Sequence, residues 1–259
     1  MSAGLEADMS VILPTYNEAE NIGSLIETLT SLYPSSKILV LDDNSSDGTP
    51  TFVSEISQRN LLVSLIQREP EDKALSASIF EGILRCDTEF FVVMDADFQH
   101  PPKDVGRIYV ALKEGNDLVI GARVDRQSLS PLRRFSSFAA QLLTHSYLWI
   151  HDQPSSRDIM TGFFGGRTEL FQRVIEEHGE LMDRRGFKAL FDLLKFTPAG
   201  TKVAEVEFEF GTRMAGESKI SSTVIMSILG QCGAPGRWAS RFAWRSVELL
   251  YPCDESKGS

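Results

Sequence analysis

The sequence predicts an α/β fold in which a mostly parallel sheet is flanked by helices. Short apolar runs alternate, along the first half of the chain, with segments whose apolar residues recur at helical spacing. Parallel strands need a long crossover connection, usually a helix, so this alternation favours a parallel sheet covered on both faces. The chain has 259 residues with 42% hydrophobic and 24% charged residues, and it shows no internal repeat, low-complexity tract or linker. These values are typical of one sizeable folded domain.

The individual elements follow from local pattern. Short apolar or alternating runs predict strands at 9–13, 37–41, 61–66, 89–94, 117–120 and 203–210. Helical spacing predicts helices from Asn17 or Glu18, from about Gly48, around 75–84, around 105–112 and over 136–150. The segment RDIMTGFFG (157–165) is interpreted as a turn followed by an irregular strand.

Polar clusters follow several of the predicted strands. They are PTYNE (14–18), DDNSSDG (42–48), DADFQ (95–99) and GAR (121–123). Ligands of open parallel sheets bind outside the carboxyl ends of the strands. One such cluster is explained by turn chemistry alone, but four on the same edge favour a binding site.

Bulk composition excludes some classes of protein. The net charge of −10 argues against a broad nucleic-acid interface. Cys86, Cys232 and Cys253 have neither zinc-type spacing nor a disulfide pattern, which fits a reducing compartment. The amino terminus lacks the regions of a signal peptide, and no apolar run approaches the roughly 18 residues of a membrane span. We therefore expect a cytoplasmic chain that would reach a membrane only peripherally, at its cytoplasmic face.

The stretch FFVVMDADFQHPP (90–102) contains the chemically most informative pair of residues. Asp95 and Asp97 are two residues apart, so an extended chain would point both carboxylates to one face. No glycine-rich dinucleotide motif or P-loop is present, and carboxylates alone would repel a phosphate. Carboxylates that hold Mg²⁺ or Mn²⁺ instead attract a diphosphate. Gln99 would be a third ligand if the extended geometry continues, whereas His100 beside two prolines is more typical of a turn. A solvated loop with helix-capping aspartates is the alternative.

Taken in order, the motifs resemble family 2 glycosyltransferases of the GT-A fold, most closely the dolichyl-phosphate mannosyltransferases. The motifs are VILPTYNEAENI, VLDDNSSDGT, MDADFQHPP, IGAR, PLRRFSS, RDIMTGFF and RMAGESK. The resemblance covers roughly residues 9–222, so we expect an N-terminal extension (1–8), a catalytic domain (9–222) and a C-terminal segment (223–259).

The resemblance implies roles for individual residues. Nucleotide-sugar contacts would come from Pro14, Tyr16, Glu18, Leu41, Asp43, Asp95, Ala96, Asp97, Arg123, Arg213 and Lys219. The catalytic residues would be Asp97 and the loop cations Arg213 and Lys219, and the metal ligands would be Asp95, Asp97 and Gln99. The acceptor phosphate would be bound by Arg133, Arg134, Ser136 and Ser137, which otherwise form an exposed basic helix start. Asp158 matches an acidic position that is either a base or an arginine partner. Asp42 is a further candidate for the nucleotide site, and Asp47 is interpreted as a capping residue.

The implied reaction is inverting transfer of mannose from GDP-mannose to a dolichyl or polyprenyl phosphate. A phosphate acceptor needs no catalytic base because its second pKa is about 6. Two alternatives stay open. The first is a glycosyltransferase that uses UDP-glucose or another donor, or a hydroxyl acceptor. The second is a non-catalytic subunit that binds a nucleotide sugar. The segment KALSAS (73–78) departs from the glycine-rich turn of the family, which would alter the base pocket.

The C-terminal segment contains RWASRFAWRSVELLY (237–251), in which arginines recur every four residues beside aromatic residues. A helix of this kind suits a membrane interface. Packing of its aromatic residues on the domain, or docking to a small membrane-anchoring subunit, are the alternatives. The chain resembles the family members that depend on such a separate subunit.

Overall fold

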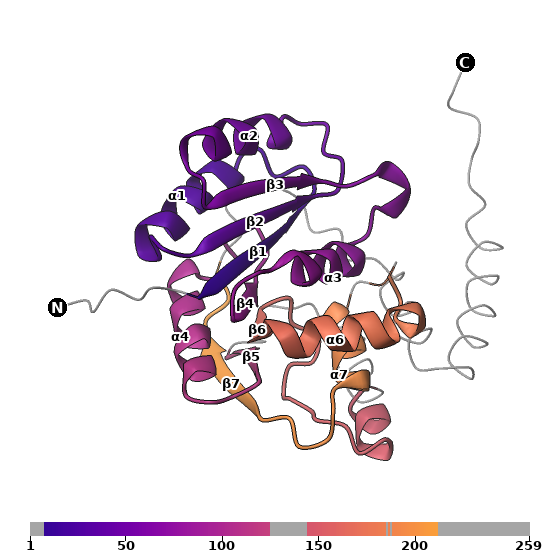
Figure 1. Ribbon diagram of the computed structural model, residues 1–259. Coiled ribbons are helices and arrows are strands. Elements are labelled where there is room, and N and C mark those ends of the chain that lie inside the picture. The colour runs from indigo at the N-terminus through magenta and orange to yellow at the C-terminus, as the bar shows by residue number, and fades with distance from the viewer. Residues whose placement is uncertain (1–7, 125–143, 185, 187, 212–259) are drawn as a thin grey trace, which may run out of the picture.

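The structure of the protein is a computed structural model, which describes residues 8–124, 144–184, 186 and 188–211 (Figure 1). Seven strands form one sheet in the order β3-β2-β1-β4-β6-β5-β7. The strands are β1 (Met9–Thr15), β2 (Lys37–Asp42), β3 (Val63–Gln67), β4 (Phe90–Val93), β5 (Leu118–Arg123), β6 (Phe164–Arg167) and β7 (Val203–Phe208). All neighbouring pairs are parallel except those made by β6, so the predicted mostly parallel sheet is confirmed.

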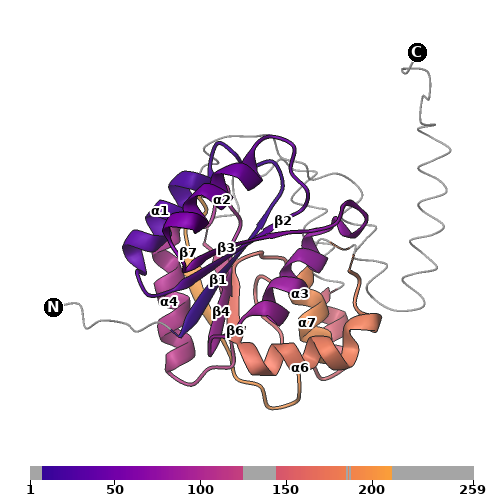
Figure 2. The ribbon, with the colours of Figure 1, turned by 45° about the horizontal axis from the view of Figure 1, so that its top comes forward.

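Helices connect the strands and cover both faces of the sheet (Figures 1 and 2). They are α1 (Ile22–Leu32), α2 (Thr49–Arg59), α3 (Leu75–Arg85), α4 (Pro102–Lys113), α6 (Thr168–His178) and α7 (Ala189–Phe196), with 3₁₀ turns η1 (Pro70–Asp72) and η2 (Gly179–Leu181). Residues 144–150 are also helical, which agrees with the end of the helix predicted over 136–150; its beginning lies outside the described residues.

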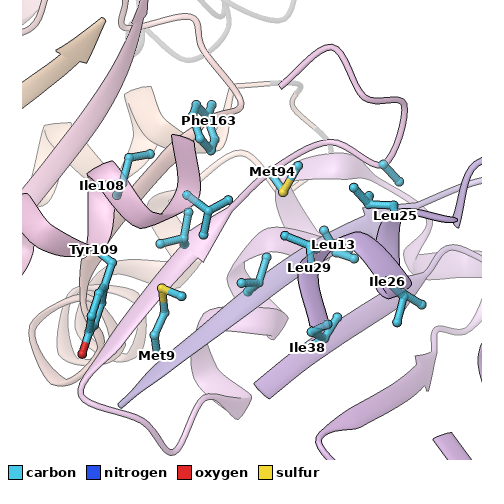
Figure 3. Packing of buried hydrophobic residues seen from close by; sticks show 14 of the residues in the cluster. Met9, Leu13, Leu25, Ile26, Leu29, Ile38, Met94, Ile108, Tyr109 and Phe163 are labelled. Atoms are coloured by element: carbon cyan, nitrogen blue, oxygen red, sulfur yellow. The ribbon is translucent and has the colours of Figure 1, made fainter. Parts of the chain in front are cut away.

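Strand side chains alternate between two apolar layers. Val11 and Leu13 of β1 face α1, α2 and α4, whereas Ile12 between them faces α3, α6 and α7. Figure 3 shows the first layer, in which Leu25 and Leu29 of α1 and Ile108 of α4 pack over the sheet. Burial of both faces explains why β1, β2 and β4 have continuous apolar sequences, whereas the partly exposed β7 has an alternating one.

The first helix begins later than predicted. The chain between Tyr16 and Asn21 turns instead of coiling, because Asn17 adopts a positive φ of 56°. The backbone N–H groups of Asn21 and Ile22 both donate to the carbonyl of Glu18, and regular helix begins only at Ile22. The polar residues of this loop therefore stand at the edge of the sheet rather than on a helix.

Strand β6 is the one antiparallel strand among the described residues. The turn predicted within RDIMTGFFG (157–165) is present at 157–160, and only the last two residues of that segment belong to β6. The glycines of β6 permit close packing: a Cβ on Gly165 would lie 2.6 Å from the carbonyl oxygen of Phe91, and one on Gly166 would lie 2.6 Å from the ring of Phe171. Because β6 runs against its neighbours, the segment that precedes it lies at the edge where β1, β2, β4 and β5 end.

None of the helices in the described part of the chain combines the length and the apolar character needed to cross a membrane. Residues 1–7 of the expected N-terminal extension, and all of the C-terminal segment 223–259, lie outside the described residues.

Candidate functional site

The loops that follow β1 and β2 are fastened to each other by side-chain hydrogen bonds. The backbone N–H of Asn17 donates to Ser45 Oγ at 2.8 Å, and Asn17 Oδ1 accepts from the N–H of Ser46 at 3.0 Å. Asp47 accepts from the N–H of Ala19 at 2.9 Å and from both the N–H and the hydroxyl of Thr49. These contacts lower the pKa of the Asp47 carboxyl even though desolvation opposes them. Asp47 thus stabilises the turn before α2, as its interpretation as a capping and turn residue predicted, although the N-cap position itself is Gly48.

Asp42 and Asp43 have different roles at the end of β2. Asp42 is buried and accepts hydrogen bonds from the N–H and the hydroxyl of Ser45, so it closes the turn. Asp43 is buried beside Arg68, whose Nη1 donates to its carboxylate. Desolvation is the largest influence on Asp43 and raises its pKa in spite of the guanidinium.

Arg68 connects the base of this site to α3. Only 1% of its side chain is exposed, and its Nε donates to Glu81 at 2.9 Å. The pKa of Glu81 is lowered, because hydrogen bonds from Arg68 and Arg85 outweigh the effect of burial. Arg68 lies 25 residues from Asp43 and follows an ordinary strand, so the sequence offered no signal for this contact.

The ring of Tyr16, in the loop after β1, contacts Lys73 of the segment that connects β3 to α3. Lys73 Nζ lies 3.1 Å from the ring centroid of Tyr16, which is a cation–π contact. Tyr16 and Glu18 are half-buried at the strand edge, whereas Pro14 and Leu41 are fully buried within paired strands. KALSAS, the segment that departs from the family pattern, thus contributes Lys73 next to a predicted nucleotide-binding residue.

Strand β4 ends at Val93, two residues before the first aspartate of DADFQ. Asp95 is half-exposed, with 39% of its side chain accessible. Its backbone N–H donates to Nδ1 of the buried His100 at 3.0 Å, and the His100 ring stacks on Phe163 with a centroid distance of 5.1 Å. Burial lowers the pKa of His100. His100 is a turn residue, as predicted, but the sequence did not reveal that it anchors Asp95.

The extended geometry on which the assignment of Gln99 depended does not continue past Asp95, because the chain turns at residues 96–97 and Phe98 adopts a positive φ of 62°. Asp97 is buried, and its Oδ1 accepts the backbone N–H of Gln99 at 3.0 Å. Ala96 is buried between the two aspartates. The strand alternation that placed Gln99 on the same face as the aspartates therefore does not hold, and its role as a metal ligand stays a prediction.

Arg123 and Asp158 meet at the same edge. Arg123 Nε lies 3.4 Å from Asp158 Oδ2, and the guanidinium lies 4.5 Å from the ring centroid of Phe210. Asp158 is buried, whereas 29% of the Arg123 side chain is exposed. Of the two roles considered for Asp158, the arginine partner is the one that this geometry supports.

The turn that carries Asp158 also reaches Asp95 and Lys188. A Cβ on Gly162 would lie 3.1 Å from Asp95 Oδ1, so a side chain at this position would require the Asp95 carboxylate to shift slightly. Lys188 Nζ donates to the carbonyl of Met160 at 2.7 Å. Burial lowers the pKa of Lys188; nearby Arg123 acts in the same direction, and Asp95 and Asp158 oppose it. Lys188 was not recognised from the sequence.

These donors fit a hard divalent cation. Asp95 and Asp97 supply carboxylate oxygens, which Mg²⁺ and Mn²⁺ prefer, and Gly162 keeps one side of Asp95 free of a side chain. Within the described ranges, no group of three or more His, Cys, Asp and Glu side chains could hold a metal ion. A cation bound to these two aspartates would therefore complete its coordination with ligand oxygens or water.

Several predicted site residues lie outside the described residues, and their roles stay predictions. They are Arg133, Arg134, Ser136, Ser137, Arg213 and Lys219. The structure brings Asp43, Asp95, Asp97 and Arg123 to one edge of the sheet. A surface groove lined by Thr88, Asp117 and Thr168 lies at the opposite edge, and none of the predicted site residues is among its lining residues.

The family match and the similar proteins of known name both indicate a glycosyltransferase. Residues 10–175 match the family described as Glycosyl transferase family 2. The chain is 35% identical over 230 residues to the dolichol-phosphate mannosyltransferase of Pyrococcus furiosus, covering 85% of this chain and 61% of that relative. It is 34% identical over 236 residues to the dolichol-phosphate mannosyltransferase of Mycosarcoma maydis, covering 86% and 76%.

A solved structure supports the same fold. Glucosyl-3-phosphoglycerate synthase from Mycobacterium tuberculosis, in complex with Mn²⁺, UDP and phosphoglyceric acid, aligns with a TM-score of 0.64 and 22% identity, covering 88% of this chain and 79% of that one. The architecture described above is accordingly a GT-A fold.

Proposed function

The chain belongs to glycosyltransferase family 2, and from this premise we propose that it transfers mannose, with inversion, from GDP-mannose to a dolichyl or other polyprenyl phosphate. The observation that carries the proposal is the position of Asp95 and Asp97, in a turn at the strand edge where Asp43 and Arg123 also lie. The names of the relatives support a lipid phosphate as acceptor and mannose as the sugar.

The donor nucleotide would bind over the loops after β1 and β2. Tyr16 offers an aromatic face, and the carboxylates of Glu18 and Asp43 accept hydrogen bonds from ring N–H groups. Arg68 holds the Asp43 carboxylate in one orientation. This set of acceptors suits guanine, and it suits uracil as well, so a UDP-sugar is the second candidate donor.

Asp95 and Asp97 would hold Mg²⁺ or Mn²⁺ with the donor diphosphate. The cation would neutralise the charge that develops on the leaving diphosphate. The rigidity of the two aspartates comes from the protein: His100 fixes the backbone of Asp95, and the N–H of Gln99 orients Asp97. We also propose that Arg213 and Lys219 assist the departure of the diphosphate and that Asp97 is catalytic through its metal contact.

The acceptor would approach from the side of Arg123 and Asp158. Pairing with Arg123 makes Asp158 a poor candidate for a base, and a phosphate monoester needs none near neutral pH. Its requirement is cationic positioning, for which we propose Arg133, Arg134, Ser136 and Ser137, while Arg123 would contact the nucleotide sugar.

We propose that residues 9–222 form the catalytic domain and that the chain acts peripherally at the cytoplasmic face of a membrane. The segment 223–259 would contact the lipid surface or a small anchoring subunit. Flotation with anionic liposomes, comparing the intact chain with one that ends at Pro235, tests the direct contact. Equal binding of the two chains would assign membrane contact to another part of the protein.

The function itself is tested by incubating the chain with radiolabelled GDP-mannose, UDP-glucose and other nucleotide sugars, together with polyprenyl phosphates and Mn²⁺ or Mg²⁺. Organic extraction then separates the lipid product. We expect label from GDP-mannose in the organic phase and none with an Asp97→Asn variant. Label from UDP-glucose alone would select the second candidate donor, and an unlabelled organic phase with every donor would refute a lipid-phosphate transferase.

A further inference from the structure

Lys188 joins two segments of the chain that are 28 residues apart in the sequence. It immediately precedes α7, and its Nζ donates to the carbonyl of Met160 at 2.7 Å. Met160 belongs to the turn over residues 157–160, between the helix that ends near Ile150 and strand β6. A side chain from the second half of the fold thus holds the backbone of the segment that crosses the strand edge.

This segment carries two of the contacts that shape the site. Asp158 is the partner of Arg123, at 3.4 Å, and Gly162 lies directly beside the Asp95 carboxylate. Movement of the turn by an ångström would change both contacts together.

Other contacts anchor the two ends of the segment, and Ile159 in its middle is buried in the core. Lys188 adds a hydrogen bond to the middle from a distant part of the chain. At the far end, the N–H of Gly121 donates to the carbonyl of Phe163 at 2.8 Å. At the near end, Glu205 accepts from the hydroxyl of Ser156 at 2.9 Å and from the N–H of Arg157 at 2.7 Å. Between these anchors, Lys188 binds the carbonyl of Met160.

The surroundings of Lys188 act on its charge in opposite directions. Burial and Arg123 lower the pKa of the Lys188 amine, and the carboxylates of Asp95 and Asp158 oppose this shift by attracting the ammonium group. A cation at this position offsets part of the repulsion between the two carboxylates, which a neutral hydrogen-bond donor would not do.

We propose that Lys188 is a positioning residue of the transfer site, which holds the Met160 carbonyl and thereby keeps Asp158 on Arg123 and Gly162 against Asp95. This inference rests on the proposed function and deepens it. Lys188 acts through the turn, so its loss impairs the alignment of acceptor and sugar more than it impairs binding of the nucleotide.

The test compares Lys188→Met, which keeps the length and removes the donor and the charge, with Lys188→Arg, which keeps both. The matched control is Lys195→Met, because Lys195 is a lysine within α7, the helix that Lys188 precedes, and its buried side chain pairs with Asp192 at 2.5 Å. Each variant of the full chain is measured for kcat with GDP-mannose and a polyprenyl phosphate, for the Kd of GDP with Mn²⁺, and for amide hydrogen exchange of peptides covering 157–165.

We expect Lys188→Met to lower kcat by about tenfold to a hundredfold, as a misplaced reacting group does, and to change the GDP Kd by less than about twofold. Exchange over 157–165 should accelerate in Lys188→Met and not in Lys195→Met, and Lys188→Arg should recover part of kcat. A kcat of Lys188→Met close to that of the parent, or a parallel loss of GDP binding, overturns the inference.

Unchanged exchange over 157–165 in Lys188→Met overturns it as well. This readout needs no turnover, so it decides the inference even if the parent chain transfers no sugar, a result that would refute the proposed function instead.

Discussion

The backbone N–H of Asp95 donates to Nδ1 of His100 across 3.0 Å, within the same turn. An Nδ1 that accepts a hydrogen bond carries no proton, so the neutral His100 ring has its proton on Nε2. The ring is buried and stacked on Phe163, and Phe208 and Phe210 lie at 5.6 Å and 5.9 Å between ring centroids. Asp95 is therefore held by a histidine that aromatic residues keep in one orientation.

Replacing His100 by leucine should impair transfer, because the N–H of Asp95 would lose its acceptor and the turn its fixed shape. We expect a fall in kcat/KM of about tenfold to a hundredfold. His100→Asn should be milder, since its side-chain oxygen is an acceptor of similar reach. Steady-state kinetics and thermal melts on the same preparations measure this, and equal losses in the two variants would contradict the hydrogen-bond explanation.

Asp97→Asn should abolish most of the metal-dependent activity, because the variant keeps its shape and loses the charge that binds the cation. We expect the activity at saturating Mn²⁺ to fall by about a hundredfold or more. The measurement is turnover as a function of Mn²⁺ concentration. Asp87→Asn is the control, because Asp87 is an exposed residue that pairs with Lys37 at 2.5 Å, away from the site. A folded Asp97→Asn protein with near-normal turnover would remove Asp97 from the metal site.

The strands, and the polar residues at the edge of the sheet where they end, could be predicted from the sequence because each feature depends on a few residues that are neighbours in the chain. The apolar run before Asp95 and the helical spacing of Leu25 and Leu29 are features of this kind. Strand β6 was harder to recognise, since two glycines in four residues are typical of a turn, and they are accommodated only because Phe91 and Phe171 pack against them.

The residues that hold the site in place could not be predicted from spacing. Arg68 contacts Asp43 from 25 positions away, and Lys188 contacts Met160 from 28 positions away. Such pairs are determined by tertiary packing, and neither residue has a local signature. The condition placed on Gln99, that the chain stays extended, is not met because Phe98 takes a left-handed conformation, which is uncommon for a bulky residue.

Arg68→Gln should destabilise the fold and weaken nucleotide binding. The substitution leaves Asp43 buried without its cation, and breaking a buried pair in this way costs about 3 kcal/mol or more. Urea unfolding gives the stability and calorimetry with GDP gives the affinity. Arg85→Gln serves as the control, because Arg85 pairs with the same Glu81 but is 55% exposed, so its loss should cost less than about 1 kcal/mol. Similar losses in the two variants would contradict the role of burial.

Cys86 should resist alkylation in the folded protein. Burial raises the pKa of its thiol to about 12, so only roughly one molecule in ten thousand carries the thiolate at pH 8. Iodoacetamide labelling followed by peptide mass spectrometry should detect modified Cys86 only after unfolding in urea. Labelling of Cys86 at the same rate with and without urea would show that the thiol is accessible in the native state.

Glu205→Gln should lower stability in a pH-dependent way. Burial alone would raise the pKa of Glu205, but hydrogen bonds from the N–H and guanidinium of Arg157 and from Ser156 outweigh it and lower the pKa. A carboxyl with a lowered folded-state pKa contributes stability that is fully present above its unfolded pKa of about 4.3 and is lost as the pH falls through the folded value. The variant should therefore be clearly less stable than the parent at pH 7, and the difference should shrink below about pH 4.

Urea unfolding at pH 7, 5 and 3.5 measures this difference. Glu207→Gln is the matched control, because Glu207 binds the same Arg157 at 3.0 Å but is 56% exposed; its substitution should have little effect at any pH. Because Glu205 holds Ser156 and Arg157 just before Asp158, its loss should also lower kcat, by less than the loss of Lys188 does. A stability difference between the parent and Glu205→Gln that stays constant from pH 7 to pH 3.5 would show that the charge of Glu205 does not stabilise this turn.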